Sequence, residues 1–438
     1  MYQDLTEGKI SKSLLFFALP MMAGNLLQQL YNIADTVIVG RFLGSNALAA
    51  VGSAYTLMTF LTSIFLGLSM GSGALFSIYK GKNDDASLRS SILHGFCLVM
   101  GVTVVLNIVV YIFIDLILKL LSVPDNVWDG MKAYLLVIFA GIIATSLYNY
   151  FSCLLRALGN STTPLIFLAV SAILNIALDL IFVAVFSWGI SGAAFATIIA
   201  QYVSGVGISI YYLRRCREFF PKKNEFKFDK NILSEISGLS FMTCVQQSVM
   251  NFGILMVQGL VNSFGSVVMA AFAAAVKIDT FAYLPVQDFG NAYSTFVAQN
   301  YGAGKKERIH RGTRTAFIIS CSFGIIISAI VCVFAGPLMR IFVSGNETAV
   351  IATGVKYLHI EGAFYYCIAC LFLLYGYYRA VKKPGMSVVL TIISLGTRVA
   401  LAYILSVFIG EIGIWMAIPI GWVFADLVGL IYMKLCKA

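Results

Sequence analysis

Long apolar segments separated by short polar stretches constrain this chain more than any other feature. A helix needs about 20 consecutive apolar residues to cross a bilayer, and such segments occupy nearly all of the 438 positions. Apolar residues make up 60% of the chain and charged ones 11%, whereas a soluble domain carries about 25% charged residues. A soluble fold of this size would leave much apolar surface in water. The sequence therefore predicts an all-α integral membrane protein with about twelve transmembrane helices.

The apolar segments also predict where the helices lie and which way they run. We expect spans at 14–40, 51–79, 92–118, 131–155, 164–187, 190–213, 234–262, 267–298, 314–341, 350–378, 385–409 and 412–433. If the termini and the loops after even-numbered spans share one side, that side holds 23 of the 30 Lys and Arg residues. The richer side faces the cytoplasm by the positive-inside rule. Both termini are then cytoplasmic, and the net charge of +10 reflects orientation in the membrane rather than nucleic-acid binding.

Landmarks recur in the two halves of the sequence. Gly81 and Gly302 are 221 positions apart, as are Gly192 and Gly413, and an Arg-Ala pair followed by proline closes the fourth and the tenth span. Six spans in each half give both halves the same orientation, so a pseudo-two-fold axis along the membrane normal should relate them. We expect an N-terminal lobe at 1–213, a cytoplasmic linker at 214–233 and a C-terminal lobe at 234–438. A cavity between two such bundles can open to either side in turn.

The sequence offers little to an enzyme or to a cofactor. Cys367 and Cys370 form a C-x-x-C inside a predicted span, where small buried residues are the better interpretation. The three histidines show no metal-ligand spacing. The stretch from Gly302 to Lys305 lacks the upstream glycine of a phosphate-binding loop and follows no strand. We therefore expect no cofactor and no ATP-driven step.

Ionisable side chains inside predicted spans are candidates for function, because each costs about 2.5–3.5 kcal/mol to insert. Asp35 is the first of them, and Gln28, Tyr31 and Asn32 lie seven, four and three positions before it on one helical face. Pro20 should act as a hinge in the same helix. The other ionisable positions are Asp179, Lys277, Asp279, Asp288, Glu361, Arg398 and Asp426.

The fifth and sixth spans predict a partner for Asp35. Asn175 and Asp179 lie four positions apart on the fifth span, and Thr197 and Gln201 lie four apart on the sixth. Two carboxylates with an amide and a hydroxyl form an oxygen-rich pocket that suits a proton or Na⁺. Two desolvated carboxylates oppose each other's charge, so one of them should load and unload a proton. Two unrelated aspartates, each satisfied by its own neighbours, are the alternative.

The second half has a different polar pattern, which suggests a substrate cavity. Polar side chains recur there at helical spacing, Pro285 can bend the eighth span, and acidic and aromatic groups suit a cationic ligand. Packing between helices is the alternative interpretation, and Glu361 and Arg398 could simply pair with each other. The candidate cavity residues are Gln28, Asn32, Gln201, Gln247, Asn251, Gln258, Asp279, Asp288 and Asn291.

Three segments resemble the multidrug and toxic compound extrusion (MATE) family. They are Ala18-Leu-Pro through Gln28-Gln-Leu-Tyr-Asn-Ile-Ala-Asp-Thr, then Arg156-Ala-Leu-Gly-Asn-Ser-Thr-Thr-Pro, and Gln299-Asn-Tyr-Gly-Ala-Gly-Lys. The resemblance covers all twelve spans, and the last segment is its most specific part. It implies a two-lobed exporter of organic cations that is driven by inward flow of protons or sodium.

The resemblance also implies an ion site in the N-terminal lobe. The DinF-type branch has an aspartate on the first helix, an asparagine and an aspartate on the fifth, and a threonine on the sixth. Here these are Asp35, Asn175, Asp179 and Thr197, which would also hold Na⁺ in a sodium-coupled protein, and Tyr31 and Pro20 match a tyrosine and a hinge proline of that branch. The NorM-type branch places acidic ligands on later helices, but the seventh span here is amide-rich.

The sequence thus predicts an ion-coupled antiporter, a monomer in a bacterial-type inner (cell) membrane. Its partners should be the lipid bilayer and a small, cationic organic substrate. One alternative is a flippase for lipid-linked precursors or polysaccharides in the same superfamily, which the acidic mid-membrane charge disfavours. Another is a receptor or channel that transports nothing against a gradient. A membrane enzyme fits least, because no reactive constellation is present.

Overall fold

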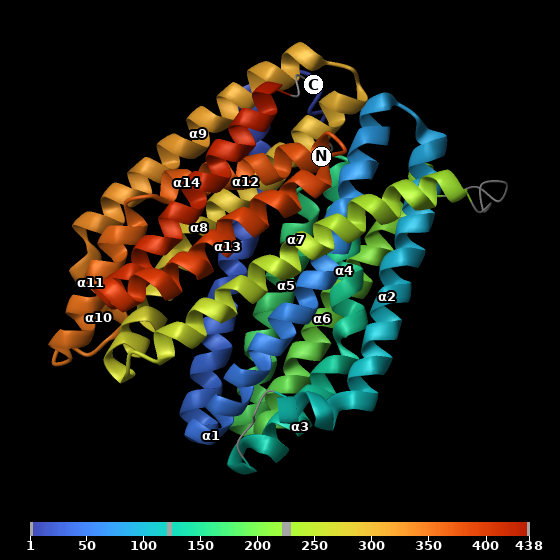
Figure 1. The fold of residues 1–438 in the computed structure, drawn as a ribbon. Helices are drawn as coiled ribbons and strands as arrows, with labels where there is room; N and C mark the ends of the chain where they lie inside the picture. Colours follow the sequence, from blue (N-terminus) through green and yellow to red (C-terminus); the bar gives the residue numbers. More distant parts are fainter. Residues whose placement is uncertain (1–2, 121–124, 221–228, 436–438) are drawn as a thin grey trace. The chain divides into compact units, whose positions relative to one another are not determined.

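The computed structural model describes residues 3–120, 125–220 and 229–435, and within these ranges the chain is helical throughout, with no strand (Figure 1). In chain order the helices are α1 (Ile10–Lys82), α2 (Asp85–Leu120), α3 (Asp125–Ala140), α4 (Ile142–Ala157), α5 (Thr162–Asp179), a π-helix (Leu180–Val185), α6 (Gly189–Arg215), a 3-10 turn (Arg217–Phe219), α7 (Lys230–Asn262), α8 (Ser266–Gly302), α9 (Lys306–Val333), α10 (Ala335–Phe342), α11 (Thr348–Gly362), α12 (Tyr365–Ala380), α13 (Pro384–Ile409) and α14 (Glu411–Leu435).

The described helices are long and apolar enough to cross a membrane. They supply ten candidate spans, two of them from α1, and the number reaches twelve when two bent helix pairs each count as one span. The helix α1 contains two spans, Ile10–Gly44 and Ala50–Lys82, which meet where Gly44 adopts a φ of 83° that favours glycine. The prediction of an all-α membrane protein is confirmed.

The surface of the helices is apolar, as a lipid environment requires. Val407 and Phe408 on α13 are 80% and 78% exposed, and Ile173 on α5 is 70% exposed. A soluble protein rarely exposes a continuous surface of this kind. These side chains therefore face lipid rather than water.

Two spans that the sequence predicts as single helices are broken. The predicted span 131–155 consists of α3 and α4, which bend by 45° at Gly141, and the predicted span 350–378 consists of α11 and α12, which bend by 50° after Gly362. A Cβ on residue 141 would lie 2.3 Å from Oε1 of Gln201, so a larger residue at that bend would require the Gln201 side chain to move. Gly141 and Gly362 are 221 positions apart, which matches the spacing of the other repeat landmarks.

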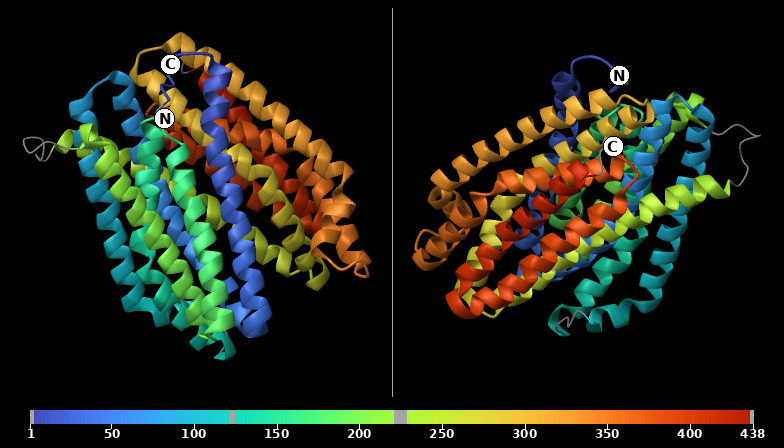
Figure 2. Two further views of the ribbon diagram at one scale, coloured as in Figure 1. Left: turned by 180° about the vertical axis from the view of Figure 1, so that it is seen from behind. Right: turned by 45° about the horizontal axis from the view of Figure 1, so that its top comes forward.

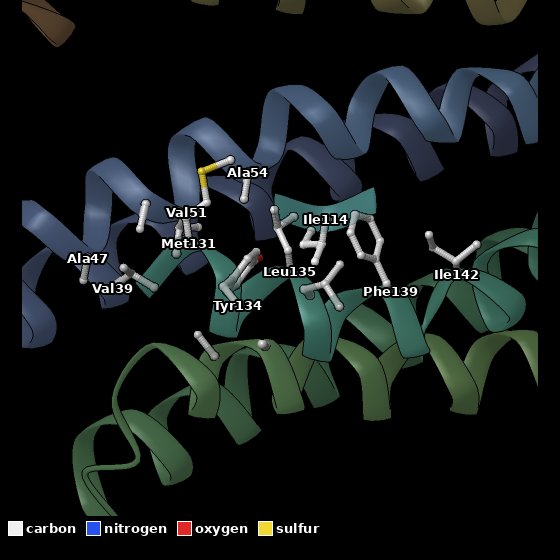
Figure 3. Close-up of a cluster of buried hydrophobic side chains, with 14 of the residues drawn as sticks. Val39, Ala47, Val51, Ala54, Ile114, Met131, Tyr134, Leu135, Phe139 and Ile142 are labelled. Atoms are coloured by element: carbon white, nitrogen blue, oxygen red, sulfur yellow. The ribbon is translucent and has the colours of Figure 1, made fainter. Parts of the chain in front are cut away.

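The first packing unit is made of residues Ala23–Cys244 together with Gln3. A buried aliphatic cluster in this unit joins α1, α2 and α3 through residues such as Val51, Ile114 and Leu135 (Figure 3). On α1, Gly71 lies so close to α7 that a Cβ would be 2.4 Å from Cα of Ser240. The hydroxyl groups of Ser72 and Ser240 are hydrogen-bonded there at 2.9 Å.

The second packing unit is made of Asp4–Met22 and the residues from Val245 onward. Helices α8 and α12 approach closely, because a Cβ on Gly376 would lie 2.6 Å from the carbonyl oxygen of Gly290. Helices α13 and α14 follow each other directly and lie side by side, as Figure 2 also shows. The limits of both units fall inside α1 and α7, and the lobe limits at 213 and 234 stay a prediction. Part of the predicted linker, 221–228, lies outside the described residues.

Candidate functional site

Two aspartates from different helices meet inside the first unit. Asp35 lies on α1, and Asp179 is the last residue of α5. Their carboxyl groups lie within hydrogen-bonding distance of each other, and Asp179 is 0% exposed. Two carboxylates in contact away from water repel each other strongly unless a proton or a cation compensates one charge. The structure thus brings together the two acids that the sequence predicts as partners.

The oxygens of this acid pair lack hydrogen-bond donors. Oδ1 of Asp35, both carboxyl oxygens of Asp179 and Oδ1 of Asn175 are buried and have no hydrogen-bond partner among the described residues. A buried polar atom without a partner costs about 1–3 kcal/mol. A proton or a cation at the acid pair would satisfy several of these atoms at once.

Asn175 and Thr197 link α5 to α6 beside the acid pair. Asn175 Nδ2 donates to Thr197 Oγ1 at 3.4 Å, and the Thr197 hydroxyl donates to the carbonyl of Ala193 at 3.0 Å. The amide nitrogen of Asn175 is therefore occupied, whereas its oxygen is not. In this orientation the Asn175 side-chain oxygen can accept a further hydrogen bond or contact a cation.

The backbone changes its helical form directly after Asp179. Residues Leu180–Val185 form a π-helix, and the amide of Phe186 donates to the carbonyl of Ile181 at 2.8 Å. π-helical turns are rare and occur often at functional sites. The wider turn begins one residue after the buried acid, and no sequence pattern predicted it.

Two tyrosines complete the surroundings of the acid pair. Tyr31 lies near Asp35 and is hydrogen-bonded to Gln28, as their shared helical face predicts. Tyr134 on α3 is 8% exposed and lies close enough to interact electrostatically with both acids. Figure 3 shows Tyr134 among the aliphatic side chains of its cluster. Sequence reasoning missed Tyr134, because one tyrosine in an apolar span is typical of ordinary packing.

The remaining predicted residues of the first unit lie in two further environments. Gln201 is next to the α3–α4 bend, and its Oε1 atom is buried without a partner among the described residues. Asn32 is partly exposed, and its carbonyl accepts a hydrogen bond from the Thr36 hydroxyl at 2.7 Å. Pro20 lies within α1 in the second unit, shortly before the first unit begins at Ala23, and the helix continues through it with helical backbone angles.

The second unit contains another buried acid cluster, built around Asp279 on α8. The Tyr357 hydroxyl donates to Asp279 Oδ2 at 2.6 Å, and the Tyr365 hydroxyl donates to Asp279 Oδ1. Glu361 and Arg398 lie within electrostatic range of Asp279, and both are buried. Sequence reasoning missed the two tyrosines, which come from the two helices of a bent pair.

Removing one of these phenols should destabilise the second unit. Tyr357→Phe leaves a buried carboxylate short of a donor, so we expect the free energy of unfolding to fall by about 1.5–3 kcal/mol. Thermal unfolding of the detergent-solubilised protein measures the change. Tyr403→Phe is the matched control, since Tyr403 is 51% exposed. Equal effects of the two substitutions would contradict the importance of this hydrogen bond.

The other predicted cavity residues of the second unit make mostly local contacts. Asn251 donates to the carbonyl of Gln247 at 3.3 Å, and Gln258 donates to the side chain of Asn262 at 2.9 Å. Asn291 accepts from Arg379 at 3.0 Å. Asp288 and Pro285 are buried within α8, which continues through the proline.

The described residues contain no group of three or more His, Cys, Asp or Glu side chains that could hold a metal ion. The set predicted for Na⁺ contains two carboxylates, an amide and a hydroxyl, so it belongs to a different class of site. The donor atoms present are all oxygens, which suits a hard cation. The ion-coupling, cavity and hinge roles stay predictions.

Known proteins are similar to this chain over nearly its whole length. The MatE family profile matches residues 20–181 and 239–404. The probable multidrug resistance protein YpnP of Bacillus subtilis (strain 168) is 31% identical over 432 residues, which cover 98% of this chain and 96% of the relative. The probable multidrug resistance protein NorM of Thermotoga maritima is 26% identical over 433 residues, which cover 97% of this chain and 92% of the relative.

Solved structures share the fold. A MOP superfamily transporter from Pyrococcus furiosus superimposes with a TM-score of 0.92 at 23% identity, covering 98% of this chain and 96% of that one. A MATE protein in complex with MaL6 gives the same TM-score and identity, covering 98% of this chain and 97% of that one. Together with the sequence matches, these results show that the chain belongs to the MatE family, as a multi-pass membrane protein and a secondary transporter rather than an enzyme.

Proposed function

We propose that this protein exports small organic cations in exchange for protons or sodium ions that enter through the Asp35–Asp179 pair. The contact between these two acids, three of whose oxygens are buried without a hydrogen-bond partner among the described residues, carries the proposal. The names of the relatives, which describe multidrug resistance, support export of drug-like molecules. The pattern Asp35, Asn175, Asp179 and Thr197 supports a DinF-like branch.

The acid pair can bind an ion because the ion relieves the repulsion between its two carboxylates. With no ion bound, the two carboxylates repel each other in a poorly hydrated site. One proton shared between them, or one Na⁺ bound by their oxygens with Asn175 and Thr197, removes the repulsion. Either ion suits this set of donors.

The proposed cycle couples this site to alternating access. In the outward-facing state the acid pair takes up an ion, and cargo is released. In the inward-facing state the ion leaves to the cytoplasm, and new cargo binds.

The ion gradient supplies enough energy for export. A potential of 100 mV contributes about 2.3 kcal/mol per charge, and one pH unit contributes about 1.4 kcal/mol. Together they sustain a concentration ratio of roughly a few hundred-fold for a neutral cargo per ion. A cationic cargo leaves against the potential, so its ratio is smaller.

A cationic cargo is supported by the buried acids of the second unit. Asp279 and Asp288 are 3% and 2% exposed, and they provide negative charge in a low-dielectric interior. Aromatic rings such as Tyr283 and Phe372, whose centroids are 6.4 Å apart, can add cation–π contacts. We further propose a monomer in a bacterial cell membrane, with both termini in the cytoplasm.

Transport with separate control of each gradient tests this function. Purified protein in liposomes should accumulate ethidium, a fluorescent organic cation, when either a pH or a sodium gradient is imposed. One of these two gradients is expected to drive transport. Collapsing that gradient alone should stop accumulation, and collapsing the other gradient alone should leave accumulation unchanged. Accumulation that is unaffected by both gradients would contradict ion coupling, and ion currents without ethidium would favour a channel.

A further inference from the structure

The most specific family motif, Gln299 to Lys305, lies outside the ion site and has no role in the proposed cycle. It covers the end of α8 and the connection to α9. Gln299 and Asn300 are buried at 3% and 0% exposure, although amide side chains at the end of a helix are usually hydrated. Burial of two amides requires partners, and the structure shows which ones they have.

The partners of these amides lie in the N-terminal segment of the chain. The Leu5 amide donates to Gln299 Oε1 at 3.2 Å, and Asn300 Nδ2 donates to the Leu5 carbonyl at 3.1 Å. The two side chains thus bind both main-chain groups of a single residue, as a neighbouring β-strand would. The Leu5 side chain is 0% exposed and fixes the position of this residue.

Two cations at the start of α9 bind the next residues of the segment. Lys305 Nζ donates to the Thr6 carbonyl at 2.9 Å. The Arg308 guanidinium donates to the carbonyls of Glu7 at 2.5 Å and of Gly8 at 2.8 Å, and it lies 5.5 Å from the centre of the Phe296 ring. Charged donors make stronger hydrogen bonds than neutral ones. Carbonyl groups of four consecutive residues, 5–8, are therefore held by side chains from the end of α8 and the start of α9.

The second family motif also contacts the N-terminal segment. The Gln3 amide donates to the carbonyl of Gly159 at 2.9 Å. Gly159 has a φ of 93°, and a Cβ there would lie 2.2 Å from the Gln3 carbonyl oxygen. A glycine is required for this approach, which is an independent sign that the position of the segment is specified.

We propose that Gln299, Asn300, Lys305 and Arg308 form a clamp that grips the main chain of residues 5–8 and fixes the start of α1 for transport. The segment leads directly into α1 at Ile10, and the chain passes from the second packing unit to the first after Met22. Pro20 lies just before that transition and lacks the amide that would bond the preceding turn. Because the clamp holds the start of α1 in place, a bend of the helix at Pro20 would move the part of α1 that carries Asp35.

The clamp residues are positioning residues, because they contact neither the acid pair nor the proposed cargo residues. This role rests on the proposed function, since it assumes that movement of α1 accompanies ion exchange. Loss of the clamp should slow the transport cycle without changing cargo binding. A segment that serves only to stabilise the fold would instead lower the thermal midpoint.

Arg308→Ala tests the clamp, with Arg311→Ala as matched control. Arg311 lies on the same helix, is exposed and pairs with Glu307 at 2.5 Å, so its replacement removes the same charge without touching the segment. Hydrogen–deuterium exchange of residues 3–9 measures the grip directly. We expect exchange to become at least about tenfold faster in Arg308→Ala and to stay unchanged in Arg311→Ala.

Ethidium transport by the same variants measures the consequence. We expect Arg308→Ala to lower the maximal rate by about tenfold with the KM for ethidium and the thermal midpoint unchanged, and Arg308→Lys to recover part of the rate. If Arg308→Ala fails to fold, Lys305→Ala removes the donor to the Thr6 carbonyl and should have the same effect.

The outcomes separate this proposal from the proposed function. Faster exchange together with a normal transport rate would overturn the positioning role, and unchanged exchange would overturn the clamp itself. In both cases the unmodified protein still shows gradient-driven transport. If the unmodified protein shows no gradient-driven transport, the proposed function itself is wrong, whatever the exchange of residues 3–9 shows.

Discussion

Replacing Asp35 with asparagine should abolish ion-driven export. The substitution keeps the size of the side chain but removes one of the two charges that make the pair bind an ion. We expect the rate of gradient-driven ethidium uptake to fall by about two orders of magnitude or more, because loss of one member removes most of the effect of a group of residues that acts as a unit. Asp115→Asn is the matched control, because Asp115 is 58% exposed and pairs with Lys132 at 2.6 Å.

Asp179→Asn should have the same effect, and the double variant should be no worse than either single one. Residues that act as one unit show such non-additive losses. Two independent sites would instead multiply their effects. A double variant whose loss equals the product of the single losses would therefore contradict a shared site, even though both acids matter.

Gly71→Leu should prevent the first unit from packing. A Cβ at this position would lie 2.4 Å from Cα of Ser240 and 2.6 Å from the Leu239 carbonyl oxygen. These are backbone atoms, which cannot move aside as a flexible side chain does. We expect a loss of about 3 kcal/mol or more in the free energy of unfolding, visible as a lower thermal midpoint and less monodisperse protein after extraction.

Gly101→Ala on α2 is the control for that substitution. No atom lies within 4 Å of a Cβ at residue 101, so the added methyl group meets open space. Alanine is favoured over glycine within a helix by about 0.5–1 kcal/mol, and the variant should be as stable as the parent or slightly more so. Similar destabilisation by both substitutions would show that the contact with Ser240 is not what excludes larger residues.

The helical architecture could be predicted because the bilayer imposes it. Each apolar segment of sufficient length must become a helix to satisfy its backbone hydrogen bonds, so composition and spacing were enough. The contact between Asp35 and Asp179 was also foreseen, because buried acids are costly and therefore few. Met256 and Ala400 stand 221 positions after these acids, so the acids depart from the repeat that the glycines follow.

The features that escaped prediction depend on contacts between segments distant in the sequence. The bend at Gly141 lies against Gln201 of α6, and the surroundings of Asp279 depend on tyrosines from two other helices. Tyr134 resembles any aromatic residue of an apolar span until α1 and α5 are placed next to it. The π-helix after Asp179 depends on backbone geometry that apolar side chains do not encode in an obvious pattern.

The family motif shows a different limit of sequence reasoning. Gln299 to Lys305 was recognisable as a resemblance, but its spacing predicts no ligand. Its partners are main-chain atoms of Leu5 and Thr6, and a contact with main-chain atoms requires no particular residue type that a sequence would show. Only the folded chain shows that the motif binds the protein's own N-terminal segment.

Ion release triggered by cargo tests the central claim most directly. Purified protein in weakly buffered detergent solution is mixed with ethidium, while a pH indicator follows protons and bound radioactive sodium is counted. We predict that the unmodified protein releases one of the two ions on mixing, and that Asp35→Asn and Asp179→Asn release neither. Undiminished release by both variants would contradict the assignment of this acid pair as the site of ion exchange.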